Sequence, residues 1–330
     1  MLILAIETSC DETSCAIVRD GVNVLSNIIN SQINIHQQFG GVVPEVASRH
    51  HIENIRSVVN EALKCAGVLL ADIDAIAVAN SPGLVGALLV GLSYAKGLGF
   101  GLKVPLIPVN HIHAHICANF ITNPKLQPNF ICLVASGGHS HIVNVRGYCD
   151  FEVLARTRDD AAGEAYDKVA RILGLGYPGG PAVAKCAEMG DENFLKLPRV
   201  KMEGSFDFSF SGVKTAVINY IHNCTQKGEE LRINDICASF QLAVNEALCS
   251  HLIDAARANK TDTIVLAGGV AANAKLRELA LQFAIDNGMK FYCPPLELCT
   301  DNAAMVGCSG YFNLQNGITA NMGLNAFASL

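Results

Sequence analysis

Two similar segments, each with the pattern of a strand, a polar turn and a second strand, constrain the fold of this chain most. In the first, residues 2–6 and 15–18 are apolar and flank a polar turn. In the second, residues 130–134 and 141–145 flank the turn 135–140. Apolar runs of this length are typical of strands. The segments lie about 125 residues apart, and such a repeat indicates a duplicated, two-lobed structure with a cleft between the lobes.

The remaining segments alternate between strand-length apolar runs and longer runs of helical period. Residues 50–66 place apolar side chains on one helix face, and further helices are predicted over 161–173, over 236–257 and from 273 onward. A short buried strand is predicted over 263–267. This alternation predicts an α/β protein.

A domain boundary is expected in the proline-containing segment 123–128. We therefore expect an N-terminal lobe over residues 1–125 and a C-terminal lobe over residues 126–330. A final helix is predicted over 299–312, and its packing back on the first lobe is left open.

Composition limits the classes of protein that the chain can belong to. Hydrophobic residues make up 50% and charged residues 16%, which excludes a disordered chain. The net charge of -6 gives no general attraction to nucleic acid, so work on RNA would need a local basic patch or a partner. The thirteen cysteines are scattered without CxxC spacing, which favours buried thiols in a reducing cytosol.

One stretch, residues 75–95, is uncharged and long enough to resemble a membrane span. The turn residues 80–83 and two later glycines, Gly86 and Gly91, interrupt it, so we predict a buried strand, a glycine turn and a buried helix. The first residues carry no basic region and reach Glu7 before any long apolar run, which argues against a signal peptide. We expect a cytoplasmic protein without a membrane partner.

The segment 110–115 contains an HxxxH motif formed by His111 and His115. In a helix, residues four apart are offset by roughly 40° and ~6 Å along the axis, so both imidazoles can reach one metal ion. A third ligand must then come from elsewhere. The alternative is a helix face whose histidines bond only backbone or solvent. The motif is not the HExxH of zinc proteases, because Ile112 follows His111.

Glycine turns follow two of the apolar runs, at residues 136–139 and 267–273. Backbone without side chains can approach a phosphate closely, so two such turns indicate a nucleotide site. Ordinary turns also use glycine pairs, and the turn 176–181 is equally ambiguous.

Residues 159–167 gather four carboxylates at a predicted helix start, either to cap the helix or, through Asp167, to bind ligand hydroxyls. The aromatic–polar alternation of residues 206–214 predicts a strand or extended wall with its phenylalanines in the core, and its Lys214 is a candidate to face phosphate.

These motifs together resemble the TsaD family of tRNA N6-adenosine threonylcarbamoyltransferases, formerly described as glycoproteases. The resemblance covers nearly the whole chain, through residues 6–13, 40–45, 82–86, 111–115, 136–139, 159–167, 177–181, 208–212, 267–273 and 300–305. It implies the two-lobed fold shared by actin, sugar kinases and the Hsp70 ATPase. It also implies a metal-dependent acyltransferase that moves a threonylcarbamoyl group from threonylcarbamoyl-AMP to N6 of adenosine 37 in tRNAs reading ANN codons, releasing AMP.

The resemblance also implies site residues. His111, His115 and Asp301 would hold one divalent metal, iron in the family and zinc as a chemically reasonable alternative. The nucleotide and acyl-adenylate site would be lined by Val134, Ala135, Ser136, Gly137, Gly138, Asp167, Gly180 and Asn273.

The chemistry is consistent with these parts. An adenine N6 amine is a poor nucleophile, so the carbamoyl carbon must be activated and held close. A metal would polarise its carbonyl as a Lewis acid. Our candidates for removing the amine proton are Asp11 and Glu12, in the first polar turn.

Two positions depart from relatives: His113 stands where many have glutamate, and Ala184 where some carry a carboxylate near the ribose. The resemblance implies tRNA, a TsaB-like paralogue and a TsaE-like ATPase as partners. The helix over 50–66 is our candidate for the paralogue's pairing surface, with Val58 as the residue to test.

Two other functions stay open. A metalloprotease would need a general base beside the metal, which this HxxxH does not supply. An ATPase or kinase of the same fold would suit the glycine turns, but Mg-ATP prefers oxygen ligands to histidines.

Overall fold

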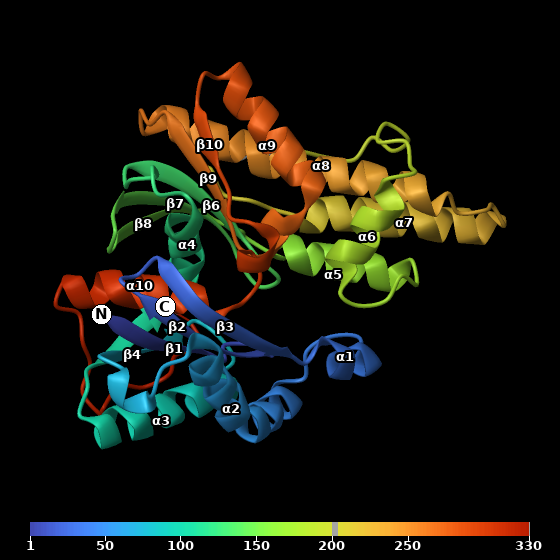
Figure 1. Ribbon diagram of the computed structural model, residues 1–330. Helices are drawn as coiled ribbons and strands as arrows, with labels where there is room; N and C mark the ends of the chain where they lie inside the picture. Colours follow the sequence, from blue (N-terminus) through green and yellow to red (C-terminus); the bar gives the residue numbers. More distant parts are fainter. Residues whose placement is uncertain (200–203, 330) are drawn as a thin grey trace. The chain divides into compact units, whose positions relative to one another are not determined.

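The same arrangement of five strands occurs twice in the chain. The computed structural model describes residues 1–199 and 204–329, and these form two units. Unit 1 comprises Met1–Pro128, Gly147–Phe151 and Pro294–Leu330, and unit 2 comprises Asn129–Arg146 and Glu152–Cys293. The sheet order is β3-β2-β1-β4-β5 in unit 1 and, read from the corresponding edge, β8-β7-β6-β9-β10 in unit 2 (Figure 1). The predicted duplication is therefore confirmed.

The sheet of unit 1 combines antiparallel and parallel pairs. Strand β1 pairs antiparallel with β2 and parallel with β4, and β4 pairs parallel with β5. Parallel neighbours need crossover connections, and helices α2 and α3 supply them. The strands are β1 (Leu2–Glu7), β2 (Glu12–Arg19), β3 (Asn23–Ser31), β4 (Ala75–Ser81) and β5 (Leu106–Asn110). The helices are α1 (Ile33–His36), α2 (Pro44–Ala66), α3 (Val85–Leu102), α4 (His111–Thr122) and α10 (Ala303–Gln315).

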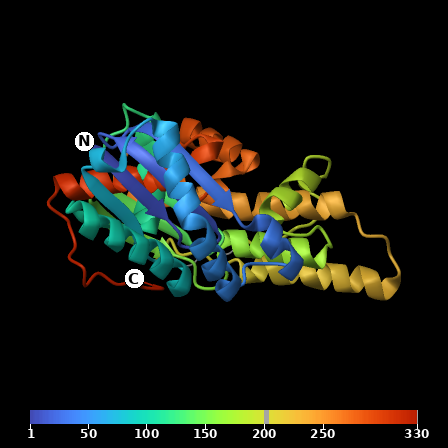
Figure 2. The ribbon, with the colours of Figure 1, turned by 60° about the horizontal axis from the view of Figure 1, so that its bottom comes forward.

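Helices cover both faces of this sheet. A Cβ on Gly310 of α10 would meet Ala77, whereas a Cβ on Gly91 of α3 would approach Ile6. Successive strand residues point to opposite faces, so α10 lies on one face and α2 and α3 on the other (Figures 1 and 2). Both faces of β4 are therefore buried along its whole length.

Unit 2 repeats the sheet and adds a helical layer. Its strands are β6 (Phe130–Ala135), β7 (Ser140–Gly147), β8 (Asp150–Arg156), β9 (Thr263–Ala267) and β10 (Lys290–Tyr292). Its helices are α5 (Ala162–Ile172), α6 (Gly179–Ala187), α7 (Ser211–Lys227), α8 (Ile233–Ala258) and α9 (Ala274–Asp286). Helix α8 is the central one, since it packs against α6, α7 and α9 and against β6 and β9.

The uncharged stretch 75–95 forms strand β4, a turn and the first part of α3, as predicted. By length and composition alone, α3 and α8 are the two helices of the described chain that could cross a membrane. Their packing gives another reason for the apolar sequence, because α8 is mostly buried within unit 2 and one face of α3 lies on the first sheet. Most of the thirteen cysteines are also buried, and in the described ranges none forms a disulfide.

One boundary and one element differ from expectation. The second lobe was expected over 126–330 with the packing of the final helix left open, and Pro294–Leu330 group with unit 1, because Gly307 and Gly310 let α10 approach Ala5 and Ala77 closely. The segment 206–214 was expected to be extended, but α7 begins at Ser211. Asp159 Oδ1 accepts the N–H groups of Phe210 and Ser211 at 2.8 and 3.3 Å, which stabilises this helix start.

Candidate metal centre and its surroundings

The HxxxH motif lies at the start of α4, directly after β5. Asn110 is the N-cap, and its Oδ1 accepts the N–H groups of Ile112 and His113 at 2.8 and 3.1 Å. His111 is therefore the first residue of the helix and His115 lies one turn further along. The helical spacing predicted for the two histidines is confirmed.

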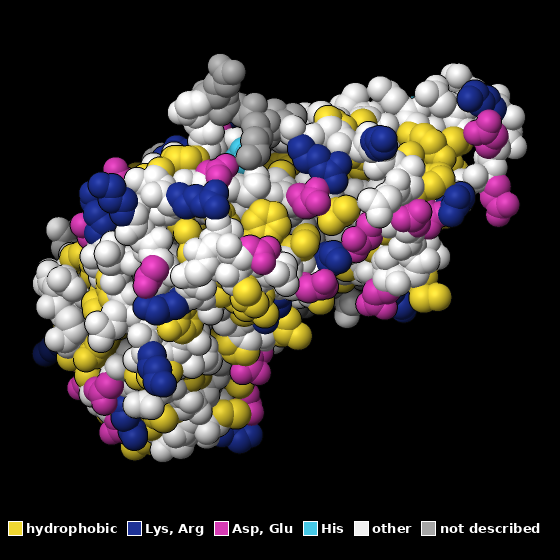
Figure 3. All heavy atoms as spheres, turned by 90° about the horizontal axis from the view of Figure 1, so that it is seen from above, with side chains coloured by type: hydrophobic (Ala, Val, Ile, Leu, Met, Phe, Trp, Pro, Cys, Tyr) yellow, Lys and Arg dark blue, Asp and Glu magenta, His cyan; other side chains and the backbone are white. Residues whose placement is uncertain are grey.

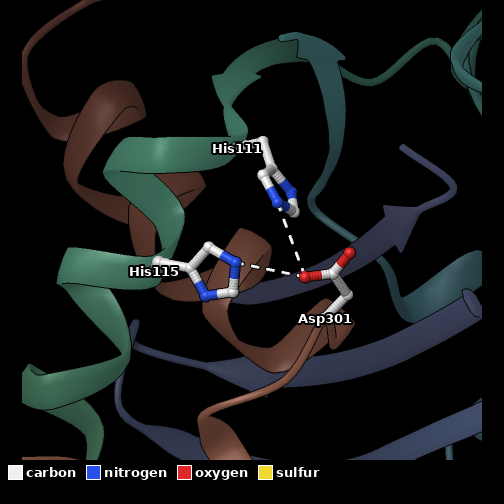
Figure 4. Close-up of side chains that lie close together, drawn as sticks. All are labelled: His111, His115 and Asp301. Atoms are coloured by element: carbon white, nitrogen blue, oxygen red, sulfur yellow. Dashed lines mark hydrogen bonds and ion pairs between the residues drawn. The ribbon is translucent and has the colours of Figure 1, made fainter. Parts of the chain in front are cut away.

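His111, His115 and Asp301 meet at one point in unit 1 (Figure 4). Asp301 Oδ1 lies 3.1 Å from His115 Nε2 and 3.5 Å from His111 Nε2. The ligand atoms all lie within 4.8 Å of one another, and the imidazole rings are nearly perpendicular, at 81°. The histidines therefore do not bond only backbone or solvent. Two imidazole nitrogens and a carboxylate oxygen form a donor set that suits Fe²⁺ or Zn²⁺.

Burial and charge act in opposite directions on the two histidines. Burial lowers the pKa of His111, but the charges of Asp301 and Glu7 outweigh it and raise the pKa to about 9. Burial lowers the pKa of His115, and the hydrogen bond to Asp301 only partly opposes this. The surrounding carboxylates therefore favour the charged ring of His111, whereas burial favours the neutral ring of His115.

His113 takes no part in this cluster among the described residues. Its ring stacks on Phe151, with centroids 4.1 Å apart, and burial lowers its pKa to about 4. It is a neutral packing residue in this structure.

Asp11 ends the turn after β1, and Glu12 is the first residue of β2. Burial, together with the neighbouring charges of Asp301 and Asp11, raises the pKa of Glu12 well above its usual range. Its Oε1 accepts a hydrogen bond from the Ser31 hydroxyl at 3.1 Å. Asp11 is buried, with 7% of its surface exposed. Glu12 is thus close enough to Asp301 for the two charges to interact, and Asp11 is its buried neighbour.

The backbone of this turn is held by α2 and α3. Leu84 donates its N–H to the Ser9 carbonyl at 2.8 Å, and the Thr8 hydroxyl donates to the Ala87 carbonyl at 2.9 Å. From α2, His51 Nε2 donates to the Cys10 carbonyl at 2.9 Å. Sequence reasoning missed His51, although a histidine among the buried positions of an amphipathic helix was a signal for it.

Sequence reasoning also missed Glu7. Its carboxylate is fully buried at the end of β1, and Oε2 lies 3.1 Å from His111 Nδ1. The signal was a charged residue immediately after a run of five apolar residues, where burial of the charge without a partner would be costly.

The residues expected to line the nucleotide site all lie in unit 2. Val134 and Ala135 are buried in β6, while Gly137 and Gly138 form an exposed turn. A Cβ on either glycine would meet no other described atom within 4 Å. Gly268 has φ +86° and packs against the Ala135 carbonyl, so the glycine turn after β9 lies beside the one after β6.

Asp167 and Asn273, the polar candidates for the nucleotide site, form hydrogen bonds to backbone groups of neighbouring turns. Asp167 Oδ1 accepts the Gly179 N–H at 2.7 Å, next to Gly180. Asn273 Oδ1 caps α9 by accepting the Leu276 N–H at 2.9 Å, and its Nδ2 donates to Gln241 Oε1 at 2.8 Å.

Lys214, the candidate to face phosphate, forms an ion pair with Asp160. Ala184 lies in α6 and is half-buried.

Comparison with known proteins gives a consistent result. A family model described as TsaD, tRNA N6-adenosine threonylcarbamoyltransferase, matches residues 23–308. A relative of that name from Clostridium perfringens is 56% identical over 330 residues, covering 100% of this chain and 97% of the relative. Another from Clostridioides difficile is 52% identical over 331 residues, covering 100% of this chain and 98% of the relative.

Solved structures support the fold alone. Full-length HypF in its phosphate- and nucleotide-bound form matches with a TM-score of 0.63 at 16% identity, over 95% of this chain and 46% of HypF. Component A of (R)-2-hydroxyglutaryl-CoA dehydratase from Acidaminococcus fermentans matches with a TM-score of 0.55 at 16% identity, over 96% of this chain and 99% of that one. Both support the actin-like two-lobed fold that the sequence predicted.

Proposed function

We propose residue roles from the premise that this chain belongs to the TsaD family of tRNA N6-adenosine threonylcarbamoyltransferases. The reaction transfers the threonylcarbamoyl group of threonylcarbamoyl-AMP to N6 of adenosine 37 in tRNAs that read ANN codons, and releases AMP. The observation that carries the assignment is full-length identity above 50% to transferases of this name. The close approach of the His111, His115 and Asp301 side chains supports the roles that follow.

In this proposal His111, His115 and Asp301 hold one divalent cation, Fe²⁺ or Zn²⁺. The cation would act as a Lewis acid that polarises the carbamoyl carbonyl. Burial of both histidines keeps water from competing for the ligand atoms and holds the rings at fixed orientations. Asp301 adds the negative charge that a divalent cation needs in a buried site.

The adenine amine must lose a proton during the transfer, and Glu12 is the best-supported acceptor. A carboxylate with a raised pKa is a stronger base than an ordinary one and works closer to neutral pH. Asp11 is the second candidate, because it is buried beside Glu12. Glu12→Gln and Asp11→Asn test this separately, and unchanged transfer by both variants would remove the proposal.

In unit 2, we assign adenylate binding to the turns after β6 and β9 and to the start of α6. Gly137, Gly138 and Gly180 leave room for a ligand to approach the backbone. Val134, Ala135 and Ser136 contribute through the end of β6, and Asp167 and Asn273 by holding the neighbouring turns.

Partners follow from charge and from one apolar surface. Basic and acidic side chains are interspersed on the face shown in Figure 3, and the net charge is -6, so we propose that tRNA binding is helped by a TsaB-like paralogue and a TsaE-like ATPase. A 540 Å³ groove between α2 and α3 is our proposed site for the paralogue; its lining includes Ile52, Ile55, Leu89 and Tyr94. Val58 was the wrong residue to test, because it is buried, whereas Ile52 is 64% exposed. We propose that the protein acts in the cytoplasm and does not bind a membrane.

The assignment is tested by incubating the chain with threonylcarbamoyl-AMP and unmodified tRNA, with and without the two partners. Nucleoside mass spectrometry should show N6-threonylcarbamoyladenosine with the wild-type chain and at least 100-fold less with His111→Ala, as expected for loss of a metal ligand. Product that is independent of His111 would contradict the metal role. No product in any combination, with ATP hydrolysis instead, would favour an ATPase. Cleavage of a glycoprotein that depends on His111 would favour a protease.

A further inference from the structure

Glu7 is a buried carboxylate that none of the roles above uses. It is the last residue of β1, and none of its surface is exposed. Its Oε1 accepts the backbone N–H of Ser9 at 2.5 Å. A buried charge is costly unless hydrogen bonds and an opposite charge compensate for it, so the partner of the second oxygen needs an explanation.

That partner is Nδ1 of His111, the ring nitrogen that points away from Asp301. Glu7 Oε2 lies 3.1 Å from His111 Nδ1, while His111 Nε2 faces Asp301. The Ser9 hydroxyl lies 3.1 Å from the same Nδ1. Nδ1 of His111 therefore lies beside a carboxylate and a hydroxyl, whereas Nε2 faces Asp301 in the metal centre.

We propose that Glu7 is a positioning residue of the metal centre, which accepts the Nδ1–H of His111 and thereby keeps the Nε2 lone pair directed at the cation. The inference rests on the proposed metal centre. Histidine ligands generally donate their other N–H to a carboxylate, carbonyl or water, which fixes the tautomer and the ring orientation. Because Glu7 ends β1 and its Oε1 is tied to the next turn, the strand sets the orientation of the ring on α4.

His115 has no such support. Its Nδ1 is buried and has no hydrogen-bond partner among residues 1–199 and 204–329. The two histidines are thus unequal: a hydrogen-bonded carboxylate orients His111, whereas packing and Asp301 alone orient His115. A change at Glu7 should therefore affect the cation chiefly through His111, the ligand that Glu7 contacts directly.

The decisive variant is Glu7→Gln, which keeps the size of the side chain. Glutamine at position 7 has a single amide oxygen. If that oxygen accepts the Ser9 N–H, the NH₂ group of the same amide must face His111 Nδ1. That nitrogen must then act as acceptor, which places the ring proton on Nε2, the nitrogen needed for the cation. We expect the affinity for Zn²⁺, measured by competition with a chromophoric chelator, to fall about 10- to 100-fold. The visible spectrum of bound Co²⁺ should change as well.

Asp235→Asn is the matched control. Asp235 is a buried carboxylate in unit 2 that accepts the Asp191 N–H at 2.7 Å, so this variant also removes a buried charge. It should bind Zn²⁺ as the wild type does. Wild-type Zn²⁺ affinity in folded Glu7→Gln would overturn the role of Glu7, whereas a wild-type chain that binds no Zn²⁺ would overturn the metal centre itself.

A second measurement covers the case in which Glu7→Gln does not fold. In the wild-type chain loaded with Zn²⁺ and labelled with ¹⁵N, the His111 ring should carry its proton on Nδ1 and none on Nε2. NMR correlation of ring nitrogens with ring protons distinguishes the two tautomers. A proton-free Nδ1 in the loaded wild type would overturn the proposal without any variant.

Discussion

His51 Nε2 donates a hydrogen bond to the carbonyl of Cys10 at 2.9 Å, and this joins helix α2 to the turn that carries Asp11. On the other side of the ring, Nδ1 accepts from the Thr13 hydroxyl at 2.7 Å. His51 is completely buried. The His51 side chain thus connects α2, the helix that also carries the exposed Ile52, to the turn beside the metal centre.

Replacing His51 by alanine should loosen this turn. The Cys10 carbonyl would lose its buried donor, so we expect the free energy of unfolding to fall by about 1–3 kcal/mol and the transfer rate to fall as well. Urea denaturation and the transfer assay measure the two effects. His50→Ala is the neighbouring control, because the His50 side chain pairs with the exposed Glu53 carboxylate. Equal effects of the two variants would contradict the role of His51.

The same histidine should make stability depend on pH. Burial lowers the pKa of His51 below its ordinary 6.5. Below pH 6.5 the unfolded chain therefore binds more protons at this residue than the folded chain, and the free energy of unfolding should fall as the pH decreases. His51→Gln, which does not titrate, should show a shallower fall between pH 7.5 and 5.5 in urea denaturation. An unchanged slope would show that other groups cause it.

Gly83 should not tolerate a side chain. A Cβ at this position would lie 2.7 Å from the Ser9 carbonyl oxygen, which already accepts the Leu84 N–H. We expect Gly83→Ala to displace the turn and to lower both the unfolding midpoint and the transfer rate. Gly97→Ala is the contrasting control in α3, because its Cβ would meet no other described atom within 4 Å. It should stabilise the helix by up to about 1 kcal/mol.

The metal ligands and His113 should behave differently. Asp301→Asn removes the charged ligand, and we expect Zn²⁺ affinity to fall at least 100-fold. His113→Gln should leave the affinity within about twofold, because His113 stacks on Phe151 and lies outside the cluster. Chelator competition measures both. A large loss of affinity in His113→Gln would show that it is a ligand after all.

The groove between α2 and α3 makes a prediction about association. Ile52→Glu places a charge on an exposed apolar residue, so it should abolish binding to the TsaB-like paralogue in size-exclusion chromatography without changing the unfolding midpoint. Ile285→Glu is the matched control, because Ile285 on α9 is 62% exposed, much like Ile52. Its complex should persist, and loss of the complex in both variants would indicate nonspecific association.

Local patterns were sufficient for several features of this protein. The strand–turn–strand repeat appears as β1–β2 and β6–β7, and the spacing of His111 and His115 predicted their common direction. These predictions depend on the periods of strands and helices, which neighbouring residues express directly. The family resemblance, and not spacing, identified Asp301 as the third member of the cluster.

Other features depend on contacts between residues far apart in the chain. Asp301 reaches His115 across 186 positions, and Glu7 reaches His111 across 104. The C-terminal helix joins unit 1 because its small residues fit the face of the first sheet, and Asp159 accepts the N–H groups of Phe210 and Ser211 where α7 begins. No local period encodes such pairs, because their partners are chosen by packing and by the need to satisfy buried polar groups. The sequence by itself determined the repeated strands and the histidine pair and, through the family resemblance, named Asp301. Only the tertiary structure showed that Glu7 contacts the far side of His111, because that contact depends on packing between residues 104 positions apart.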